Sequence, residues 1–131
     1  MNGPKKVTAA ILRKDGKLLI AKRQSGDTFE GEWEFPGGKI EEGETPEQCL
    51  RRELFEEFGI DTIIKNILCI VPYTYTEGSI LLYAYEVAHS KGNFKLNVHD
   101  EVKWVELCDL GMYNFLEADK LIIEKLVGGT K

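Results

Sequence analysis

One helix with clear start and stop signals constrains the fold of this chain more than any other segment. Thr45 can cap the helix, Pro46 suits the first helical position, and Gln48 completes a capping box. Gly59 supplies the residue of positive φ with which many helices end. The sequence therefore predicts a helix from Thr45 to about Phe58.

The other patterned segments alternate in polarity or are rich in β-branched and aromatic residues, which is typical of strands. Asp15-Gly16 and Glu77-Gly78 lie between pairs of such segments and predict hairpin turns. The predicted strands cover residues 7–12, 18–21, 33–35, 63–76, 79–87 and 102–107, and a closing helix covers 118–126. Strands interspersed with two helices predict an α/β fold with a mixed sheet covered on both faces.

Composition limits the class of protein. A chain of 131 residues without repeats or linkers predicts a single domain over 1–131. The net charge of -5 lacks the basic footprint of a protein that binds duplex nucleic acid. An acidic protein that binds a phosphorylated substrate needs metal ions to neutralise the phosphates.

The sequence also bears on compartment and on metal type. No apolar stretch reaches membrane-spanning length and no signal region precedes Lys6, so we expect no membrane partner. The odd number of cysteines indicates reduced thiols and a cytoplasmic protein. His89 and His99 are too far apart in sequence to suggest a helical metal pair, which disfavours a transition-metal site.

Three carboxylates share one stripe of the predicted helix. Glu53, Glu56 and Glu57 stand at i, i+3 and i+4, where their like charges repel unless a cation lies among them. Oxygen ligands favour Mg²⁺, with Mn²⁺ as a possible substitute. The neighbouring apolar stripe, which would dock on the sheet, consists of Leu50, Leu54 and Phe58. The alternative is an ordinary solvated acidic surface.

The segment 38–60 resembles the Nudix box, G-x5-E-x7-R-E-U-x-E-E-x-G-U, in which U is apolar. The match includes every fixed position: Gly38, Glu44, Arg52, Glu53, Leu54, Glu56, Glu57, Gly59 and Ile60. The resemblance implies an α/β/α sandwich, with the mixed sheet between helices, and a hydrolase that cuts phosphoanhydride bonds in nucleotides.

The resemblance also implies roles for individual residues. Glu53, Glu56 and Glu57 would bind the divalent metal together with the carbonyl of Gly37, and Arg52 would hold the glutamates in position.

Three further residues of the motif would have structural roles. Glu44 would support the loop, Gly38 with its neighbour Gly37 would let the backbone approach the metal, and Gly59 would accept positive φ.

Two glutamates are candidates for the general base that removes a proton from the attacking water. Glu53 is the first choice, as the base or as its metal-holding partner. In parts of the family a glutamate outside the box serves instead, and Glu101 lies where one is often found. The alternative for Glu101 is a polar residue at the start of a strand.

Looser similarity beyond the box points to the MutT and CTP pyrophosphohydrolase branch. It rests on Lys22-Arg23, the run W-E-F-P-G-G from Trp33 and the run E-A-D-K-L-I-I-E-K-L from Glu117. This branch implies hydrolysis of a nucleoside triphosphate to a monophosphate and pyrophosphate. Arg23 would contact phosphate, or would be only an exposed charge at a strand end.

Asp119 is the residue most informative about the base. Enzymes that favour 8-oxo-dGTP can carry asparagine at the matching position, whereas an ionised aspartate only accepts hydrogen bonds and suits N4 of cytosine. A buried, protonated aspartate would donate, so oxidised purines stay open. Asp119 could instead cap the last helix. Phe35 and Phe115 are candidates to stack on the base, or are plain core.

Two other functions remain open on the sequence. One is a Nudix enzyme that acts on ADP-ribose or a dinucleoside polyphosphate, and the other is a noncatalytic nucleotide-binding module. Retention of all three glutamates and Arg52 favours an enzyme. No residue decides between a monomer and a homodimer.

Overall fold

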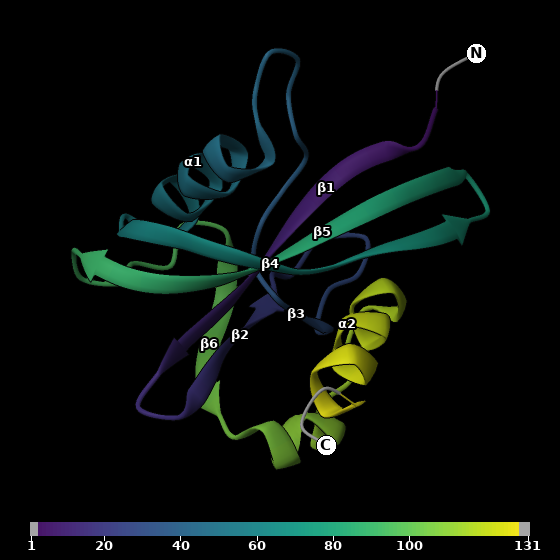
Figure 1. Cartoon of the computed structure of the whole chain (residues 1–131). Coiled ribbons are helices and arrows are strands. Elements are labelled where there is room, and N and C mark those ends of the chain that lie inside the picture. The colour runs from purple at the N-terminus through teal and green to yellow at the C-terminus, as the bar shows by residue number, and fades with distance from the viewer. Residues whose placement is uncertain (1–2, 129–131) are drawn as a thin grey trace.

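A mixed sheet runs through the protein, whose computed structural model describes residues 3–128 (Figure 1). Its strands are β1 (Lys5–Lys14), β2 (Lys17–Arg23), β3 (Trp33–Glu34), β4 (Asp61–Tyr75), β5 (Gly78–Lys91) and β6 (His99–Val105). The strand order is β3-β2-β1-β5-β4, and β6 pairs with β2. β1 and β5 are parallel and the other pairs are antiparallel, which confirms the predicted mixed sheet.

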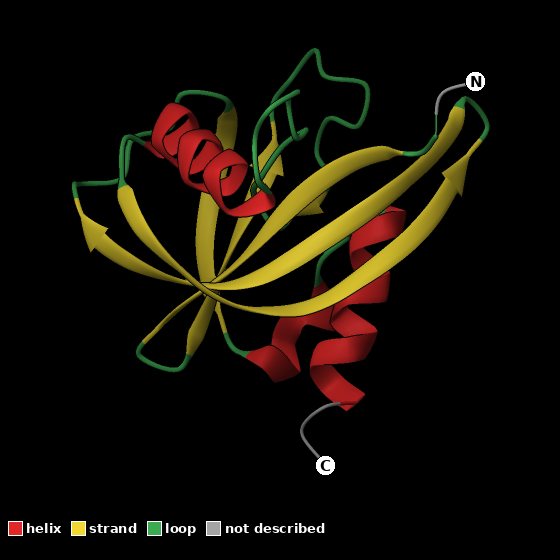
Figure 2. Cartoon of the chain, turned by 45° about the horizontal axis from the view of Figure 1, so that its top comes forward, coloured by secondary structure: helices red, strands yellow, loops and turns green. Residues whose placement is uncertain are grey.

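One helix covers each face of this sheet (Figure 2). Leu50, Leu54 and Phe58 of α1 (Pro46–Phe58) are fully buried in a core that includes residues of β1, β2 and β5. Ile122 and Leu126 of α2 (Glu117–Gly128) belong to a second core. Each such buried side chain contributes about 1.5–3 kcal/mol. The predicted α/β/α sandwich is therefore confirmed.

The C-terminal part of the sheet differs from the prediction. β6 begins at His99, not at residue 102, because pairing with β2 extends the strand through polar residues. It ends at Val105, and a 3-10 helix, η1 (Leu107–Met112), follows it. The sequence pattern did not predict η1, since a single 3-10 turn buries too few side chains to leave a clear period.

Residues 36–40 occupy the edge of β1 that β2 leaves free. β1 and β2 pair only beside their turn, at Arg13 and Lys14. Further along, the backbone N–H of Ala10 donates to the Pro36 carbonyl over 2.7 Å, and that of Thr8 donates to the Gly38 carbonyl over 2.8 Å. This pairing fixes the loop that leads into α1.

Two simpler predictions concern membranes and thiols. Among the described residues, no helix is long and apolar enough to cross a membrane. The thiols of Cys49, Cys69 and Cys108 are all free, as predicted.

Both ends of α1 have the predicted caps. The Gln48 N–H donates to Thr45 Oγ1 over 3.1 Å, and the Thr45 N–H donates to Gln48 Oε1 over 3.0 Å. At the other end, Gly59 has φ 70° and its N–H donates to the Phe55 carbonyl over 2.8 Å. The acidic residues in the last turns of α1 are thereby held on a helix with defined ends.

Gly59→Ala is predicted to lower the free energy of unfolding by about 1 kcal/mol, because a side chain is strained in the left-handed region. Gly111→Ala is the control, since a Cβ at Gly111 meets open space and its φ is not positive. Urea unfolding followed by circular dichroism measures both. Equal stabilities of the two variants would contradict the account of Gly59.

Candidate active site

Arg52 joins the acidic residues at one side of α1. Its Nε donates to Glu44 Oε2 over 2.6 Å, and its Nη1 donates to Glu53 Oε2 over 3.0 Å and to Glu56 Oε1 over 3.2 Å. The hydrogen bond from Arg52 lowers the pKa of Glu44 to about 2, so that this carboxylate stays ionised. One guanidinium thus orients the loop glutamate and two helix glutamates.

Gly37 and Gly38 lie where a side chain would collide with the site. A Cβ on Gly37 would be 2.0 Å from the Thr8 carbonyl oxygen, and one on Gly38 would be 2.3 Å from the carboxylate carbon of Glu53. The glycines let the loop pack against β1 on one side and against Glu53 on the other. The predicted approach of this backbone to a metal stays a prediction.

Glu57 is a buried carboxyl group with an unsatisfied oxygen. Its residue is 7% exposed, and Oε1 has no hydrogen-bond partner among the described residues. Burial, together with the nearby carboxylates of Glu34 and Glu53, raises the pKa of Glu57 to about 10. A cation bound here would remove the charge repulsion and supply a partner for Oε1.

The three helix glutamates do not form a closed metal cage. Among residues 3–128, no three His, Cys, Asp or Glu side chains converge as metal ligands. Glu56 is 56% exposed and bound to Arg52, while Glu57 faces inward. The orphaned oxygen of Glu57 and the glycine-lined space beside Glu53 nevertheless fit a hard divalent ion, which prefers carboxylates, waters and phosphates.

A chain of hydrogen-bonded polar groups that the sequence did not reveal lies beside Glu57. Arg23 donates to Asp27 and, over 2.7 Å, to Glu34 Oε1, and His99 Nε2 lies 2.7 Å from Glu34 Oε2. Burial lowers the pKa of Arg23, but the hydrogen bonds of Asp27 and Glu34 outweigh it and leave the pKa raised. The only sequence signal for Glu34 was an acidic residue between two aromatics.

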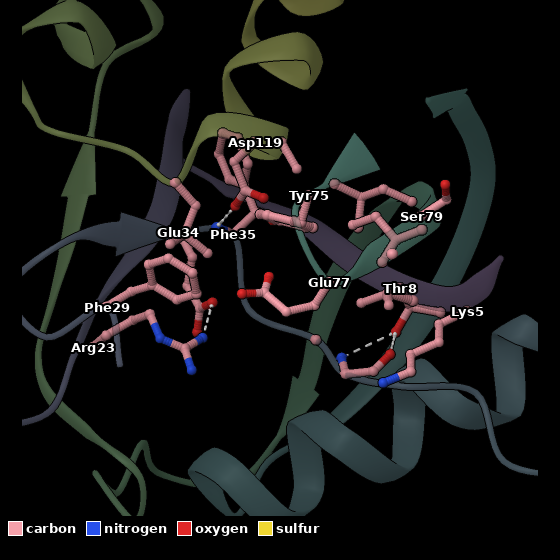
Figure 3. Close-up of a pocket in the computed structure, with 18 residues that line it drawn as sticks. Lys5, Thr8, Arg23, Phe29, Glu34, Phe35, Tyr75, Glu77, Ser79 and Asp119 are labelled. Atoms are coloured by element: carbon pink, nitrogen blue, oxygen red, sulfur yellow. Dashed lines mark hydrogen bonds and ion pairs between the residues drawn. The ribbon is translucent and has the colours of Figure 1, made fainter. Parts of the chain in front are cut away.

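Two adjoining cavities meet at this network. The first, of about 370 Å³, contains the predicted substrate residues Arg23, Phe35 and Asp119 in its wall (Figure 3). The second, of about 290 Å³, is lined by Glu57 and His99. Four residues line both cavities: Arg23, Glu34, Gly37 and Gly38. A ligand with an apolar and an acidic end can therefore extend from one cavity into the other.

Asp119 is a buried residue in the wall of the larger cavity. It is 5% exposed, and its Oδ2 accepts a hydrogen bond from the backbone N–H of Phe35 over 2.8 Å (Figure 3). Burial raises the pKa of Asp119 well above its usual value, the carboxylate of Glu34 adds to this, and the Phe35 bond opposes it. The side chain thus accepts from the loop after β3. A helix cap, the alternative role, would require it to accept from a backbone N–H of α2.

Glu101 and Phe115 lie outside both cavities, as do Glu53 and Glu56 of α1. Glu101 is on β6 opposite Lys22, with a carboxylate oxygen 3.8 Å from Lys103 Nζ, and its side chain is 46% exposed. Phe115 is 2% exposed, and its ring packs on Phe35 with centroids 5.3 Å apart. The structure does not bring Glu101 to the glutamates of α1, and it makes Phe115 a core residue that supports Phe35.

Comparison with known proteins agrees with this geometry. The NUDIX domain family matches residues 4–126. The CTP pyrophosphohydrolase of Escherichia coli is 33% identical over 118 residues, which are 90% of this chain and 87% of that protein. The 8-oxo-dGTP diphosphatase of Haemophilus influenzae is 34% identical over 125 residues, which are 95% of this chain and 92% of that protein.

The fold comparison gives the same answer. The crystal structure of a MutT protein from Methanosarcina mazei matches with a TM-score of 0.87 and 26% identity, and covers 100% of this chain and 99% of its own. Sequence motif, fold and relatives agree over nearly the whole chain. The chain therefore belongs to the Nudix family of hydrolases, in its MutT-like branch.

Proposed function

We propose that this protein is a Mg²⁺-dependent nucleoside triphosphate pyrophosphohydrolase, which converts a (d)NTP and water to the monophosphate and pyrophosphate. The observation that carries the proposal is the pair of adjoining cavities. Phe35 and Asp119 in the wall of the larger cavity could contact the nucleobase. Glu57, from the acidic side of α1, lines the smaller cavity. Arg23 lies in the wall that both share, at a place suited to a phosphate, although Asp27 and Glu34 hold it.

Glu53, Glu56, Glu57 and the Gly37 carbonyl would hold Mg²⁺, with Mn²⁺ as a substitute. When bound, the ion would neutralise phosphate charge and make a water more acidic. Arg52 keeps Glu53 and Glu56 oriented through its hydrogen bonds.

The bond chemistry needs one proton acceptor. Glu53 lies against the Gly38 backbone and is our choice for the base that takes a proton from water. The water oxygen then forms a bond to phosphorus as the phosphoanhydride bond breaks and pyrophosphate leaves. Glu101 is the less favoured base, since its half-exposed side chain lies on β6 opposite Lys22 and near Lys103, whereas Glu53 is bound to Arg52 of the motif.

Asp119 would read the base in two ways. Its raised pKa favours the neutral acid; in that form Oδ2 accepts from Phe35 and the other oxygen would donate to an acceptor such as O6 of an oxidised guanine. When ionised, the same oxygen would accept from N4 of cytosine. Both 8-oxo-dGTP and (d)CTP are therefore substrates to test, and the two named relatives carry these activities in their names.

The function is tested with Mg²⁺ on the common triphosphates, 8-oxo-dGTP, ADP-ribose and a dinucleoside polyphosphate, by measuring pyrophosphate release and by chromatography of the nucleotide products. We expect pyrophosphate from at least one triphosphate, and a rate at least about 100-fold lower for Glu53→Gln. Glu124→Gln, exposed on α2, is the control and should retain activity. Cleavage of ADP-ribose alone would identify a different Nudix activity, and nucleotide binding without cleavage would identify a binding module.

Metal affinity is predicted to rise with pH. Because burial holds the pKa of Glu57 at about 10, this group is protonated at neutral pH, and a cation must displace the proton. Between about pH 6.5 and 8.5, Mn²⁺ affinity should increase by up to about tenfold per pH unit. Calorimetry in two buffers of different ionisation enthalpy measures the released proton. Glu57→Gln should fold but release none, and a pH-independent affinity in wild type would refute this view.

Asp119→Asn is predicted to shift base preference toward 8-oxo-dGTP over dCTP by about tenfold. The amide oxygen would accept from the Phe35 N–H, which leaves only a donor for the base. In wild type the ratio of kcat/KM for dCTP to that for 8-oxo-dGTP should rise with pH, and in the variant it should be flat. Asp61→Asn, exposed on β4, is the control. An unchanged preference would remove Asp119 from base recognition.

A further inference from the structure

The segment between β5 and β6 closes the C-terminal end of α1. The backbone N–H of Lys95 donates to the Phe58 carbonyl over 2.9 Å, and that of Asn97 donates to the Glu57 carbonyl over 3.1 Å. The side-chain Nδ2 of Asn97 donates to the Glu56 carbonyl over 2.9 Å. Helix ends leave such carbonyls without partners, so these bonds fix the last turn of α1.

His99 continues this contact in the interior. Its side chain is 3% exposed, and its ring stacks on Phe58 at 9°, with centroids 5.4 Å apart. Nε2 lies 2.7 Å from Glu34 Oε2, and Nδ1 lies 4.0 Å from Glu57 Oε1. His99 thus lies between an acidic residue of the larger cavity and an acidic residue of α1.

The two facing atoms of His99 and Glu57 share one property. Nδ1 and Oε1 are both buried, and neither has a hydrogen-bond partner among the described residues. Buried polar atoms without partners are rare in proteins and often mark functional sites. Oε1 of Glu57 therefore faces His99 without a hydrogen bond, while the backbone carbonyl of Glu57 accepts from Asn97.

We propose that Asn97 and His99 are positioning residues. They hold the last turn of α1, which carries Glu57, at a fixed distance from Glu34 and the larger cavity. Asn97 sets the backbone of Glu56 and Glu57, and His99 sets the separation of the Glu57 and Glu34 side chains. The inference rests on the proposed function, because it assigns these residues to the placement of a metal-binding glutamate. Supporting residues of this kind change metal affinity or activity by about 10- to 100-fold when they are removed.

The test compares His99→Phe with His99→Gln. Phenylalanine keeps a ring against Phe58 but removes the contact with Glu34, whereas the glutamine amide can replace Nε2. We expect His99→Phe to weaken Mn²⁺ binding in calorimetry by about 10-fold or more and to lower kcat more than it raises KM. His99→Gln should retain most of the wild-type Mn²⁺ affinity and most of the wild-type kcat. Urea unfolding shows whether each variant folds.

Asn97→Ala provides an independent arm at an exposed side chain, and Asn66→Ala, exposed on β4, is its matched control. Asn97→Ala should weaken Mn²⁺ binding by several-fold, and Asn66→Ala should leave it unchanged. Folded His99→Phe and Asn97→Ala proteins with wild-type Mn²⁺ affinity and wild-type kcat would overturn the proposal. If His99→Phe does not fold, Asn97→Ala decides alone.

Measurements on the wild-type protein test the proposed function, whereas comparison of the variants with wild type tests the positioning role. A wild-type protein that binds Mn²⁺ but releases no pyrophosphate would refute the triphosphate activity, and the effect of the variants on Mn²⁺ affinity would still decide the positioning role. A wild-type protein that binds no Mn²⁺ would overturn both.

Discussion

Burial of the Glu57 carboxyl is the interaction on which the site depends. An acid in this position is costly, because water is excluded and Glu34 and Glu53 lie nearby. The fold accommodates it by keeping the group protonated in the absence of a cation. The same burial that destabilises the ionised form would strengthen its attraction for a divalent ion. The unfavourable burial of Glu57 and its proposed role in metal binding thus have the same structural cause.

The divergence of β1 and β2 makes room for this arrangement. Because the two strands pair only beside their turn, residues 36–40 can pair with β1, which places Gly37 and Gly38 between β1 and the cavities. Both glycines line both cavities. The loop therefore contributes backbone, and no side chains, at the place where the proposed base and phosphate ends of a nucleotide meet.

Electrostatics divides the acidic groups of the site into two classes. Glu44 is bound by Arg52 and keeps a low pKa, whereas Glu57 and Asp119 are buried and have raised pKa values. The first class serves structure, since an ionised pair holds its geometry. The second class can exchange a proton for a ligand. The net charge of the chain says nothing about this division, which depends on which carboxylates meet Arg52 and which meet the core.

The sequence by itself determined α1, its caps and the order of its glutamates, because these depend on contacts within about four residues. It also determined the hairpins and the mixed sheet. Only the tertiary structure decided that Glu34 meets His99 and that Asp119 meets Phe35, contacts that join residues 65 and 84 positions apart. It also decided that Glu101 lies outside the cavities. Such contacts follow from strand register and helix packing, which leave no local pattern in the chain.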